Sequence, residues 1–109
     1  MKIAVVGSRN ITVENIGKYI PNCEELISGG AVGVDSCVAA YAQKNGIKLT
    51  EFLPEYKRYG KAAPIIRNKQ IVDHADKVIV FWNGSSKGTL SVIKYAEKTK
   101  KICNVIICK

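Results

Sequence analysis

The chain contains 109 residues, of which 47% are hydrophobic and 24% charged. This length suits one domain, residues 1–109, which would bury about 65% of the surface that its unfolded chain exposes. No apolar stretch approaches the roughly 18 residues of a membrane span, and the apolar start at residues 3–6 is too short for the core of a signal peptide. We therefore expect a cytoplasmic protein that has no membrane partner.

The net charge indicates which class of partner to expect, and the cysteine pattern bears on metal binding. Seventeen lysines and arginines against nine acidic residues give a net charge of +8, which favours nucleotides or nucleic acid. Several lysines fall late in the last predicted helix, where they also suit the negative helix end. The four cysteines include no C-x-x-C pair and are accompanied by a single histidine, His74. We expect reduced thiols and no metal site.

The first half of the chain predicts two strands and two helices. Residues 2–6 (KIAVV) form a nearly continuous apolar run that ends at a turn, which is typical of a central parallel strand. Thr12 caps a short helix over residues 12–20, whose apolar positions recur at helical spacing. Residues 24–28 (EELIS) form the second strand. A glycine-rich turn then leads into a helix over residues 35–44, which an Asn-Gly pair stops.

The next segment predicts an edge strand, a loop and a helix. Residues 47–53 begin with alternating apolar and polar residues, which is typical of a more exposed strand. Residues 54–64 form a polar, basic loop. Pro64 suits the first turn of a helix that runs to about residue 75, and we expect His74, near its end, to be solvated or to cap it.

The last segment predicts another strand–turn–helix unit and a final strand. Residues 77–82 (KVIVFW) form the second nearly continuous apolar run, and Phe81 is expected in the core. A third glycine turn spans residues 83–88. A helix over about 89–100 follows, and residues 102–107 (ICNVII) form the last strand.

Strands and helices thus alternate along the chain, which predicts an α/β fold: one Rossmann-like, three-layer αβα domain with a parallel five-stranded sheet. The two most apolar strands belong at the centre and the alternating third strand at an edge. The strand order 3-2-1-4-5 satisfies both conditions. In this order the chain reverses direction between strands 1 and 4, where ligands bind beyond the carboxyl ends of the strands.

The three glycine turns and the basic loop converge on this crevice. Their glycines, hydroxyls and positive charges suit a phosphate-rich ligand, because free N–H groups and a helix N-terminus bind anions. The candidate ligand-binding residues of the turns are Gly7, Ser8, Arg9, Gly29, Gly30, Ala31, Gly33, Asp35, Gly84, Ser86, Gly88 and Thr89. Simpler roles stay open: an ordinary tight turn at residues 7–9, a helix cap at Ser85 or Ser86, and, for Asp35, either capping of its own helix or hydrogen bonding to ribose hydroxyls.

Asn68 gives an independent indication. It falls near the middle of the apolar face of the predicted helix over residues 64–75, and an unpaired buried amide costs about 1–3 kcal/mol. Asn68 therefore bonds a neighbouring glycine loop, as a structural anchor, or a ligand. Arg67 lies at the edge of the same face, and we expect it to contact the ligand.

Aromatic residues near the crevice suggest base stacking. Trp82 ends a central strand and is a candidate for stacking on a base. In the basic loop, two tyrosines are interleaved with Lys57, Arg58 and Lys61. This pattern is the basis of an alternative, single-stranded nucleic-acid binding.

The motifs resemble those of the SLOG superfamily, which joins the Smf/DprA DNA-processing proteins to the Lonely Guy phosphoribohydrolases. The resemblance rests on VGSR at 6–9, ISGGAVGVD at 27–35, the RN pair at 67–68 and the glycine turn at 84–89, within about residues 3–100. The first three look most like the DprA Rossmann domain. The short form looks like the YspA-type branch, whose members are proposed nucleotide-ligand binders.

The resemblance and the residues together lead to three functional hypotheses. The first is binding or sensing of a phosphorylated nucleotide-derived ligand, such as an ADP-ribose-like, NAD-like or nucleoside monophosphate molecule, with no catalytic residue and no required cofactor. The second is DprA-like binding of single-stranded DNA. The third is a phosphoribohydrolase or other nucleotide hydrolase using Asp35 or Glu51, which is disfavoured because Val92 occupies the position of the Lonely Guy glutamate. The oligomeric state stays open, with a homodimer as one candidate.

Overall fold

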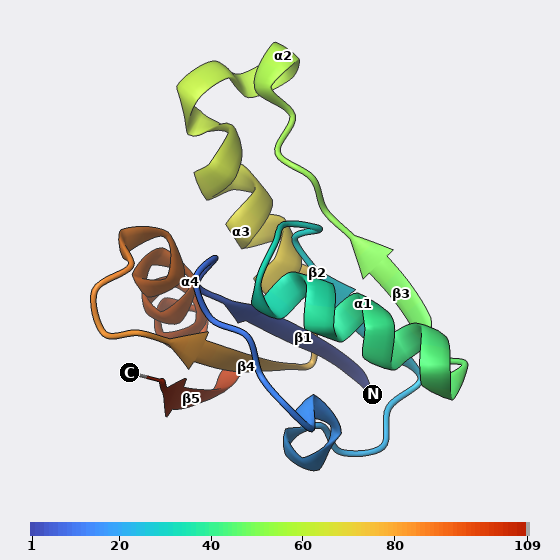
Figure 1. Ribbon diagram of the computed structural model, residues 1–109. Coiled ribbons are helices and arrows are strands. Elements are labelled where there is room, and N and C mark those ends of the chain that lie inside the picture. The colour runs from blue at the N-terminus through green and yellow to red at the C-terminus, as the bar shows by residue number, and fades with distance from the viewer. Residues whose placement is uncertain (109) are drawn as a thin grey trace.

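The computed structural model describes residues 1–108, which form a parallel sheet flanked by helices (Figure 1). The strands are β1 (Lys2–Gly7), β2 (Glu25–Ser28), β3 (Lys48–Glu51), β4 (Lys77–Trp82) and β5 (Ile102–Ile107). The helices are α1 (Val34–Asn45), α2 (Tyr56–Tyr59), α3 (Ala63–His74) and α4 (Lys87–Lys98), with two 3-10 segments, η1 (Ile16–Tyr19) and η2 (Gly60–Ala62). Outside two regions described below, these bounds lie within two residues of the predicted ones.

The sheet has the predicted topology. All neighbouring strands pair in parallel, in the order β3-β2-β1-β4-β5, so the Rossmann-like α/β fold class is confirmed. The central pair, β1 and β4, runs in register from Ile3 opposite Lys77 to Gly7 opposite Phe81. Each of these strands buries four successive residues, as their continuous apolar runs indicate. The chain reverses its direction of winding between them.

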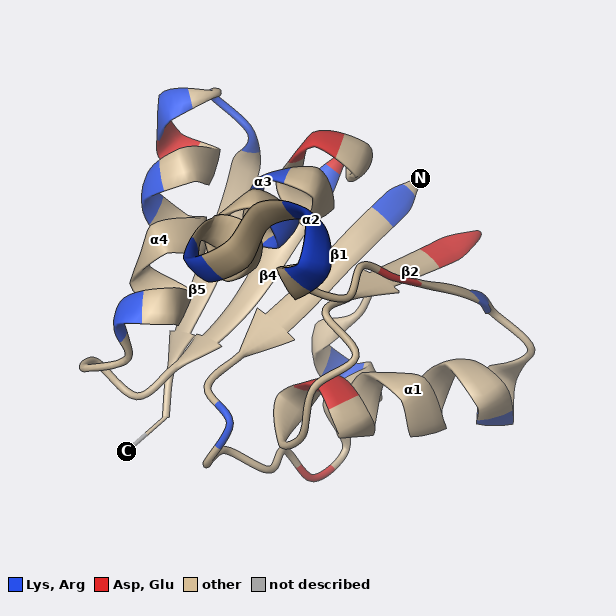
Figure 2. Cartoon of the chain, turned by 90° about the horizontal axis from the view of Figure 1, so that it is seen from above, with Lys and Arg blue, Asp and Glu red and all other residues tan. Residues whose placement is uncertain are grey.

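Two apolar layers hold the helices on the sheet. Figure 2 shows α1 on one side and α3 and α4 on the other. Successive residues of a strand point to opposite faces, so Ile3 and Val5 pack on the α1 side, whereas Ala4 and Val6 pack beneath α3 and α4. Phe81 is fully buried in the α1 layer, as predicted. No helix within residues 1–108 combines the length and apolar content that crossing a bilayer requires.

The predicted helix over residues 12–20 is wrong in its extent. Only η1 forms there, and Thr12 does not cap it. The reason is the backbone of Asn15, which adopts left-handed angles (φ 53°, ψ 46°) and interrupts a right-handed helix. The apolar residues of this segment still face the core, because Ile16 and Ile20 are buried in the α1 layer.

The predicted loop over residues 54–64 is also wrong, because most of it is helical. It contains α2 and η2, and α3 begins at Ala63. Lysine, arginine and alanine are good helix formers, and Gly60, with a positive φ of 58°, ends α2. We call residues 54–62 the arm. In Figure 1 the arm projects from the body of the domain, beyond the end of β3.

His74 has a partner that its position in the sequence did not reveal. Its Nε2 lies 2.9 Å from Oε2 of Glu25, a buried carboxylate at the start of β2. The hydroxyl of Thr50 donates to the same oxygen over 2.8 Å. His74 is therefore partly exposed and in hydrogen-bond contact with Glu25, rather than only solvated or capping.

Candidate functional site

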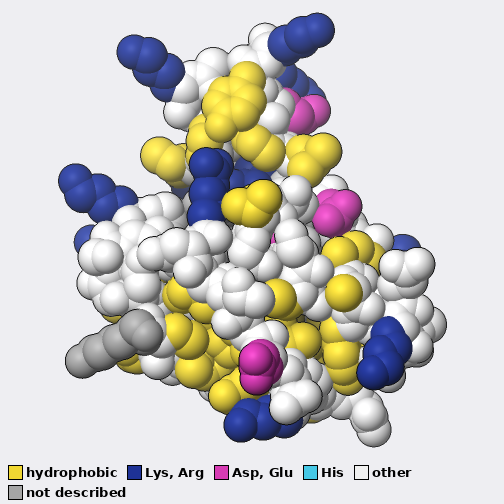
Figure 3. Space-filling model, viewed as in Figure 1, with side chains coloured by type: hydrophobic (Ala, Val, Ile, Leu, Met, Phe, Trp, Pro, Cys, Tyr) yellow, Lys and Arg dark blue, Asp and Glu magenta, His cyan; other side chains and the backbone are white. Residues whose placement is uncertain are grey.

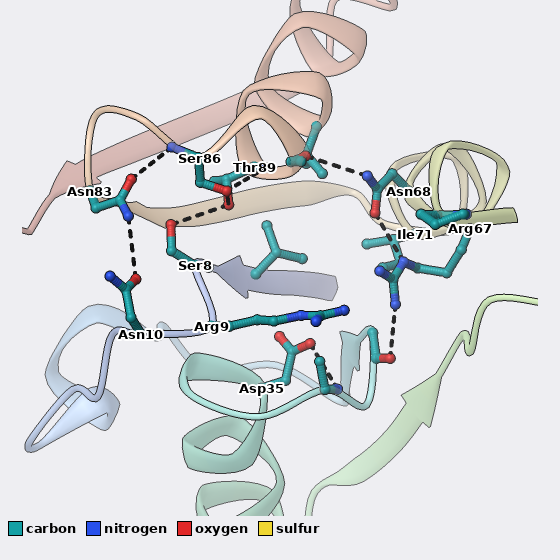
Figure 4. A pocket seen from close by; sticks show the side chains of 17 residues that line it. Ser8, Arg9, Asn10, Asp35, Arg67, Asn68, Ile71, Asn83, Ser86 and Thr89 are labelled. Carbon is teal, nitrogen blue, oxygen red and sulfur yellow. Dashed lines mark hydrogen bonds between the residues drawn. The ribbon is translucent and has the colours of Figure 1, made fainter. Parts of the chain in front are cut away.

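A pocket of about 480 Å³ opens at the carboxyl ends of β1, β2 and β4, where the strand order reverses (Figure 4). It lies where the topology places a ligand site. The turns after these three strands, together with α3 and the start of α4, form its walls. The lining residues are Val6, Gly7, Ser8, Arg9, Asn10, Gly29, Ala31, Asp35, Pro64, Arg67, Asn68, Ile71, Asn83, Ser86, Gly88, Thr89 and Val92.

The turn after β1 is locked against two other elements. A Cβ on Gly7 would lie 2.7 Å from Val34 Cβ and 2.9 Å from the carbonyl oxygen of Phe81, so only glycine fits. The Ser8 N–H donates to the same Phe81 carbonyl over 3.2 Å, and its buried hydroxyl lies 3.4 Å from that of Thr89. Arg9 is exposed, and its side chain extends across the pocket, above Asp35 (Figure 4).

The turn after β2 is shaped by close approaches to its glycines. A Cβ on Gly29 would lie 2.6 Å from Nη1 of Arg67. Gly33 has φ +75°, and a Cβ there would lie 2.5 Å from the carbonyl oxygen of Arg9. Gly33 therefore requires glycine, because side chains rarely adopt this conformation. At Gly29 a side chain would displace the Arg67 guanidinium from its place beside the turn.

Asp35 supports this turn and does not cap its own helix. The N-cap of α1 is Gly33, and no side chain caps it. Oδ2 of Asp35 instead accepts a hydrogen bond from the N–H of Ala31, which precedes the helix, over 3.1 Å. Burial raises the pKa of the Asp35 carboxyl above its usual range, although the Ala31 N–H and the charge of Arg67 act in the opposite direction. Oδ1 has no hydrogen-bond partner within residues 1–108.

Arg67 and Asn68 join the turn after β2 to α4. Arg67 donates from Nη1 to the Gly29 carbonyl and from Nε to Oδ1 of Asn68, each over 3.0 Å. The Asn68 amide donates in turn to the Ser91 hydroxyl over 3.0 Å and to the Gly88 carbonyl over 3.4 Å. The predicted structural anchor at Asn68 is thus confirmed. Burial lowers the pKa of Arg67, but a guanidinium keeps its charge in proteins.

The turn after β4 presents the N-terminus of α4 to the pocket. Asn83 Oδ1 accepts hydrogen bonds from the N–H groups of Ser85 and Ser86. The Ser86 hydroxyl accepts from the N–H of Thr89 over 3.3 Å, so Ser86 is a helix cap. The first intrahelical hydrogen bond of α4 ends on the Ser86 carbonyl, and the N–H of Gly88 precedes it. Gly88 lines the pocket, and a Cβ there would meet nothing within 4 Å, so the space beside its Cα is open.

Several predicted site residues lie outside the lining. Gly30 and Gly84 have positive φ and shape their turns, as Gly33 does. Trp82 donates from its indole N–H to the Ser86 carbonyl over 3.0 Å and packs in the layer beneath α3 and α4, so it steadies the turn after β4 instead of offering a face to the pocket. The basic residues Lys57, Arg58 and Lys61 are exposed on the arm.

Other lining residues were not singled out from the sequence. Asn10 and Asn83 meet across the pocket mouth, where the Asn83 amide donates to Asn10 Oδ1 over 3.3 Å. Their position just after two central strands, at the edge where ligands bind, would have indicated them as candidates. Ile71 lies on the apolar face of α3 and is buried, yet it also reaches the pocket, as does the buried Val92, which the sequence singled out only as the residue at the position of the Lonely Guy glutamate.

The charge of the pocket is positive. Its lining within the described residues contains two arginines, Arg9 and Arg67, and one carboxyl group, Asp35. Histidine and cysteine are absent from this lining. Comparisons of the chain with protein-family models, curated proteins and solved structures find no match. The geometry of the pocket therefore carries the functional argument.

Proposed function

We propose that this chain binds a phosphorylated, nucleotide-derived ligand in the pocket at the carboxyl ends of β1, β2 and β4. The observation that carries the proposal is the convergence, in one pocket, of Arg9, Arg67 and the open backbone at Gly88. Two cations, of which Arg67 is held by hydrogen bonds, and a helix N-terminus attract an anion, and a single carboxyl group does not offset them.

The phosphate binds at the start of α4 in this proposal. α4 has twelve residues and contributes about half an elementary charge at its N-terminus. The open space beside Gly88 lets a phosphate oxygen approach the backbone N–H. Arg9, which is exposed and extends over the pocket, supplies a charge-assisted hydrogen bond to the same group (Figure 4).

The remaining space suits a nucleoside. A volume of about 480 Å³ lies within the range of roughly 300–1,000 Å³ that is typical of small-molecule sites. Val6, Ile71 and Val92 provide apolar surface in the lining. The resemblance to the SLOG superfamily supports the same ligand class, because its GSR, SGGAxGxD and RN motifs supply much of the lining. AMP, ADP-ribose and NAD are the ligands to test first.

The proposal is binding without catalysis. Val92, which corresponds to the Lonely Guy glutamate in the resemblance, lines the pocket and offers neither an acid nor a base. Asp35 is the one carboxyl group in the described lining, so a second carboxyl group to work with it as an acid–base pair is missing there. Under this proposal, prolonged incubation with AMP releases no adenine.

Thermal denaturation with AMP, ADP-ribose, NAD and inorganic phosphate tests the proposal. A ligand at a hundred times its dissociation constant adds about 2.7 kcal/mol to the free energy of unfolding, which corresponds to a rise in Tm of roughly 10 °C for a domain of this size. Arg9→Ala should abolish most of this rise without lowering the Tm of the free chain, because Arg9 is exposed. Lys94→Ala, which removes an exposed cation on α4, is the matched control. The absence of any rise across the panel would refute the proposal.

The exposed basic and aromatic side chains of the arm favour a second candidate function, the binding of single-stranded nucleic acid. Figure 3 shows Lys and Arg side chains on both sides of its tip. Lys57, Arg58 and Lys61 are exposed, and Tyr56 is 56% exposed, so cations and an aromatic face accompany one another. Binding of a labelled oligonucleotide should weaken with salt, at a slope near −0.7 per phosphate contacted. If K57A/R58A/K61A leaves both the affinity and this slope unchanged, the arm is not the binding surface.

A further inference from the structure

One carboxyl oxygen of the pocket has no partner. Asp35 is 6% exposed, and its Oδ1 is the one buried side-chain oxygen or nitrogen without a hydrogen bond in the described part of the chain. Buried polar groups are almost always paired, and an unpaired one costs free energy. Asp35 lines the pocket beneath the exposed side chain of Arg9 (Figure 4). Oδ1 itself has almost no accessible surface, so a bound molecule supplies the missing donor once Arg9 turns aside towards it.

The carboxyl group is held in place for such a contact. Oδ2 is fixed by the Ala31 N–H over 3.1 Å, and a Cβ on Gly29 would lie 3.1 Å from the same oxygen. The hydrogen bond holds Oδ2 on the side of the turn after β2. Asp35 is also the second residue of α1, where the positive helix end favours a carboxylate. An ionised carboxylate is an acceptor only, so the ligand must bring a hydroxyl or an amino group.

The position of Asp35 favours a sugar hydroxyl over a base amino group as the donor. In Figure 4, Asp35 lies on the opposite wall from Ser86 and Thr89, at the start of α4, where the phosphate is placed by the proposed function. In a nucleotide the sugar follows the phosphate directly, and its hydroxyls are therefore the first donors available beyond it. Base amino groups lie farther from the phosphate, and inosine monophosphate lacks one altogether.

We propose that Oδ1 of Asp35 accepts a hydrogen bond from a ribose hydroxyl, so that the pocket selects ribonucleotides over their deoxy analogues. This inference rests on the proposed function and deepens it by assigning a specificity-determining residue. The hydroxyl donates and the carboxylate accepts. A deoxy analogue leaves the oxygen unpaired in the complex, and a lost hydrogen bond to a charged group weakens binding by about 10- to 100-fold.

Calorimetric titration of the full chain tests the inference with matched ligands. The ligands are AMP, 2′-deoxy-AMP, 3′-deoxy-AMP, inosine monophosphate, ADP-ribose and 2′-deoxy-ADP-ribose. We expect at least one deoxy analogue to bind about 10- to 100-fold more weakly than its parent, and inosine monophosphate to bind like AMP. Equal binding of parents and deoxy analogues overturns the inference and leaves the proposed function standing. Loss of binding with inosine monophosphate alone assigns Asp35 to the base and also overturns it. If neither parent binds, both proposals fail.

Two variants connect the discrimination to Asp35. Asp35→Asn keeps an acceptor for the Ala31 N–H but replaces the charged acceptor by a neutral amide, whose hydrogen bond to a hydroxyl is weaker. The ratio of ribose to deoxyribose affinity should therefore fall. Arg9→Ala should weaken all the ligands and leave this ratio unchanged, because the ratio depends on Asp35. An unchanged ratio in Asp35→Asn overturns the inference. Should that variant fail to fold, the native chain with the ligand series above still decides.

Discussion

Substitution of Gly88 by alanine separates the stability of α4 from its capacity to bind an anion. Gly88 is the second residue of α4 and has no positive φ, so alanine fits its backbone. The added methyl group would meet nothing within 4 Å. Replacing glycine with alanine at a compatible position stabilises a protein by about 0.4–1 kcal/mol. We therefore expect the Tm of the free chain to rise by roughly 2–4 °C.

The same methyl group should weaken ligand binding. It projects into the space through which a phosphate oxygen reaches the backbone of Gly88. Loss of a charge-assisted hydrogen bond there corresponds to about 1.5–3 kcal/mol, which is a 10- to 100-fold rise in Kd for AMP or ADP-ribose. Differential scanning fluorimetry measures the first effect and calorimetric titration the second.

The opposite signs of the two effects make the result decisive. Lys94→Ala, farther along the same helix, is the control, because it changes an exposed side chain outside the pocket. It should leave the Kd unchanged. If Gly88→Ala binds the ligand as tightly as the native chain, the phosphate does not lie at the start of α4. A fall in Tm would show that the space at Gly88 is filled.

Three further predictions concern stability. Gly33→Ala should cost about 1–3 kcal/mol of backbone strain and, in addition, a clash with the Arg9 carbonyl. Gly46 also has a positive φ, but a Cβ there meets nothing within 4 Å, so Gly46→Ala carries the strain without the clash. The chemical denaturation midpoint of Gly33→Ala should be the lower of the two, and equal midpoints would contradict this. Thr50 and His74 lower the pKa of Glu25 in the folded chain. The stability that Glu25 contributes is therefore present above its pKa in the unfolded chain and is lost as the pH falls through its pKa in the folded chain. Glu25→Gln should lower the Tm at pH 7, and the melting curves of the native chain and the variant should come together in acid. Burial raises the pKa of Asp35, so the folded chain binds more protons than the unfolded chain at mildly acidic pH, and the free energy of unfolding falls as the pH rises through that range. Asp35→Asn should therefore raise the Tm of the ligand-free chain at neutral pH by a few degrees. A lower Tm would refute this.

The central sheet was predictable because its strands carry strong, local signals. The runs of β1 and β4 are apolar at nearly every position, which occurs when a parallel strand is covered on both faces. The alternating start of residues 47–53 placed β3 at an edge, and the strand order followed from these two facts. Once the order is known, parallel pairing brings the turns after β1, β2 and β4 to one side.

The failures arose where the backbone departs from the periodicity of its side chains. Residues 12–20 have helical spacing, yet the left-handed backbone at Asn15 limits the helix to η1. Residues 54–64 look like a loop because two prolines bound them, although helix formers lie between. In the first region the backbone of one residue, Asn15, limits the helix, and in the second the bounding prolines hid a helix. The spacing of apolar residues revealed neither.

The candidate site was predictable in its glycines and less so in its side-chain partners. The wheel position of Asn68 indicated a bonded amide, and the structure supplies Ser91 as its partner. For Trp82, a position at the end of a strand left two directions open. In the structure its indole N–H donates to the Ser86 carbonyl, and the residue lies outside the pocket lining. Contacts across 20 or more residues, such as that of Arg67 with Gly29, depend on three-dimensional packing that local sequence patterns do not encode.

A backbone amide titration is the most direct test of the proposed function. In a ¹H–¹⁵N correlation spectrum, addition of ADP-ribose should shift the amide signals of Ser8, Ala31 and Gly88, which line the pocket, and leave those of the arm unchanged. The account predicts saturable shifts that are confined to the pocket and that need an about 10- to 100-fold higher ligand concentration in Gly88→Ala. Shifts limited to residues 56–62, or no shifts for any nucleotide, would contradict it.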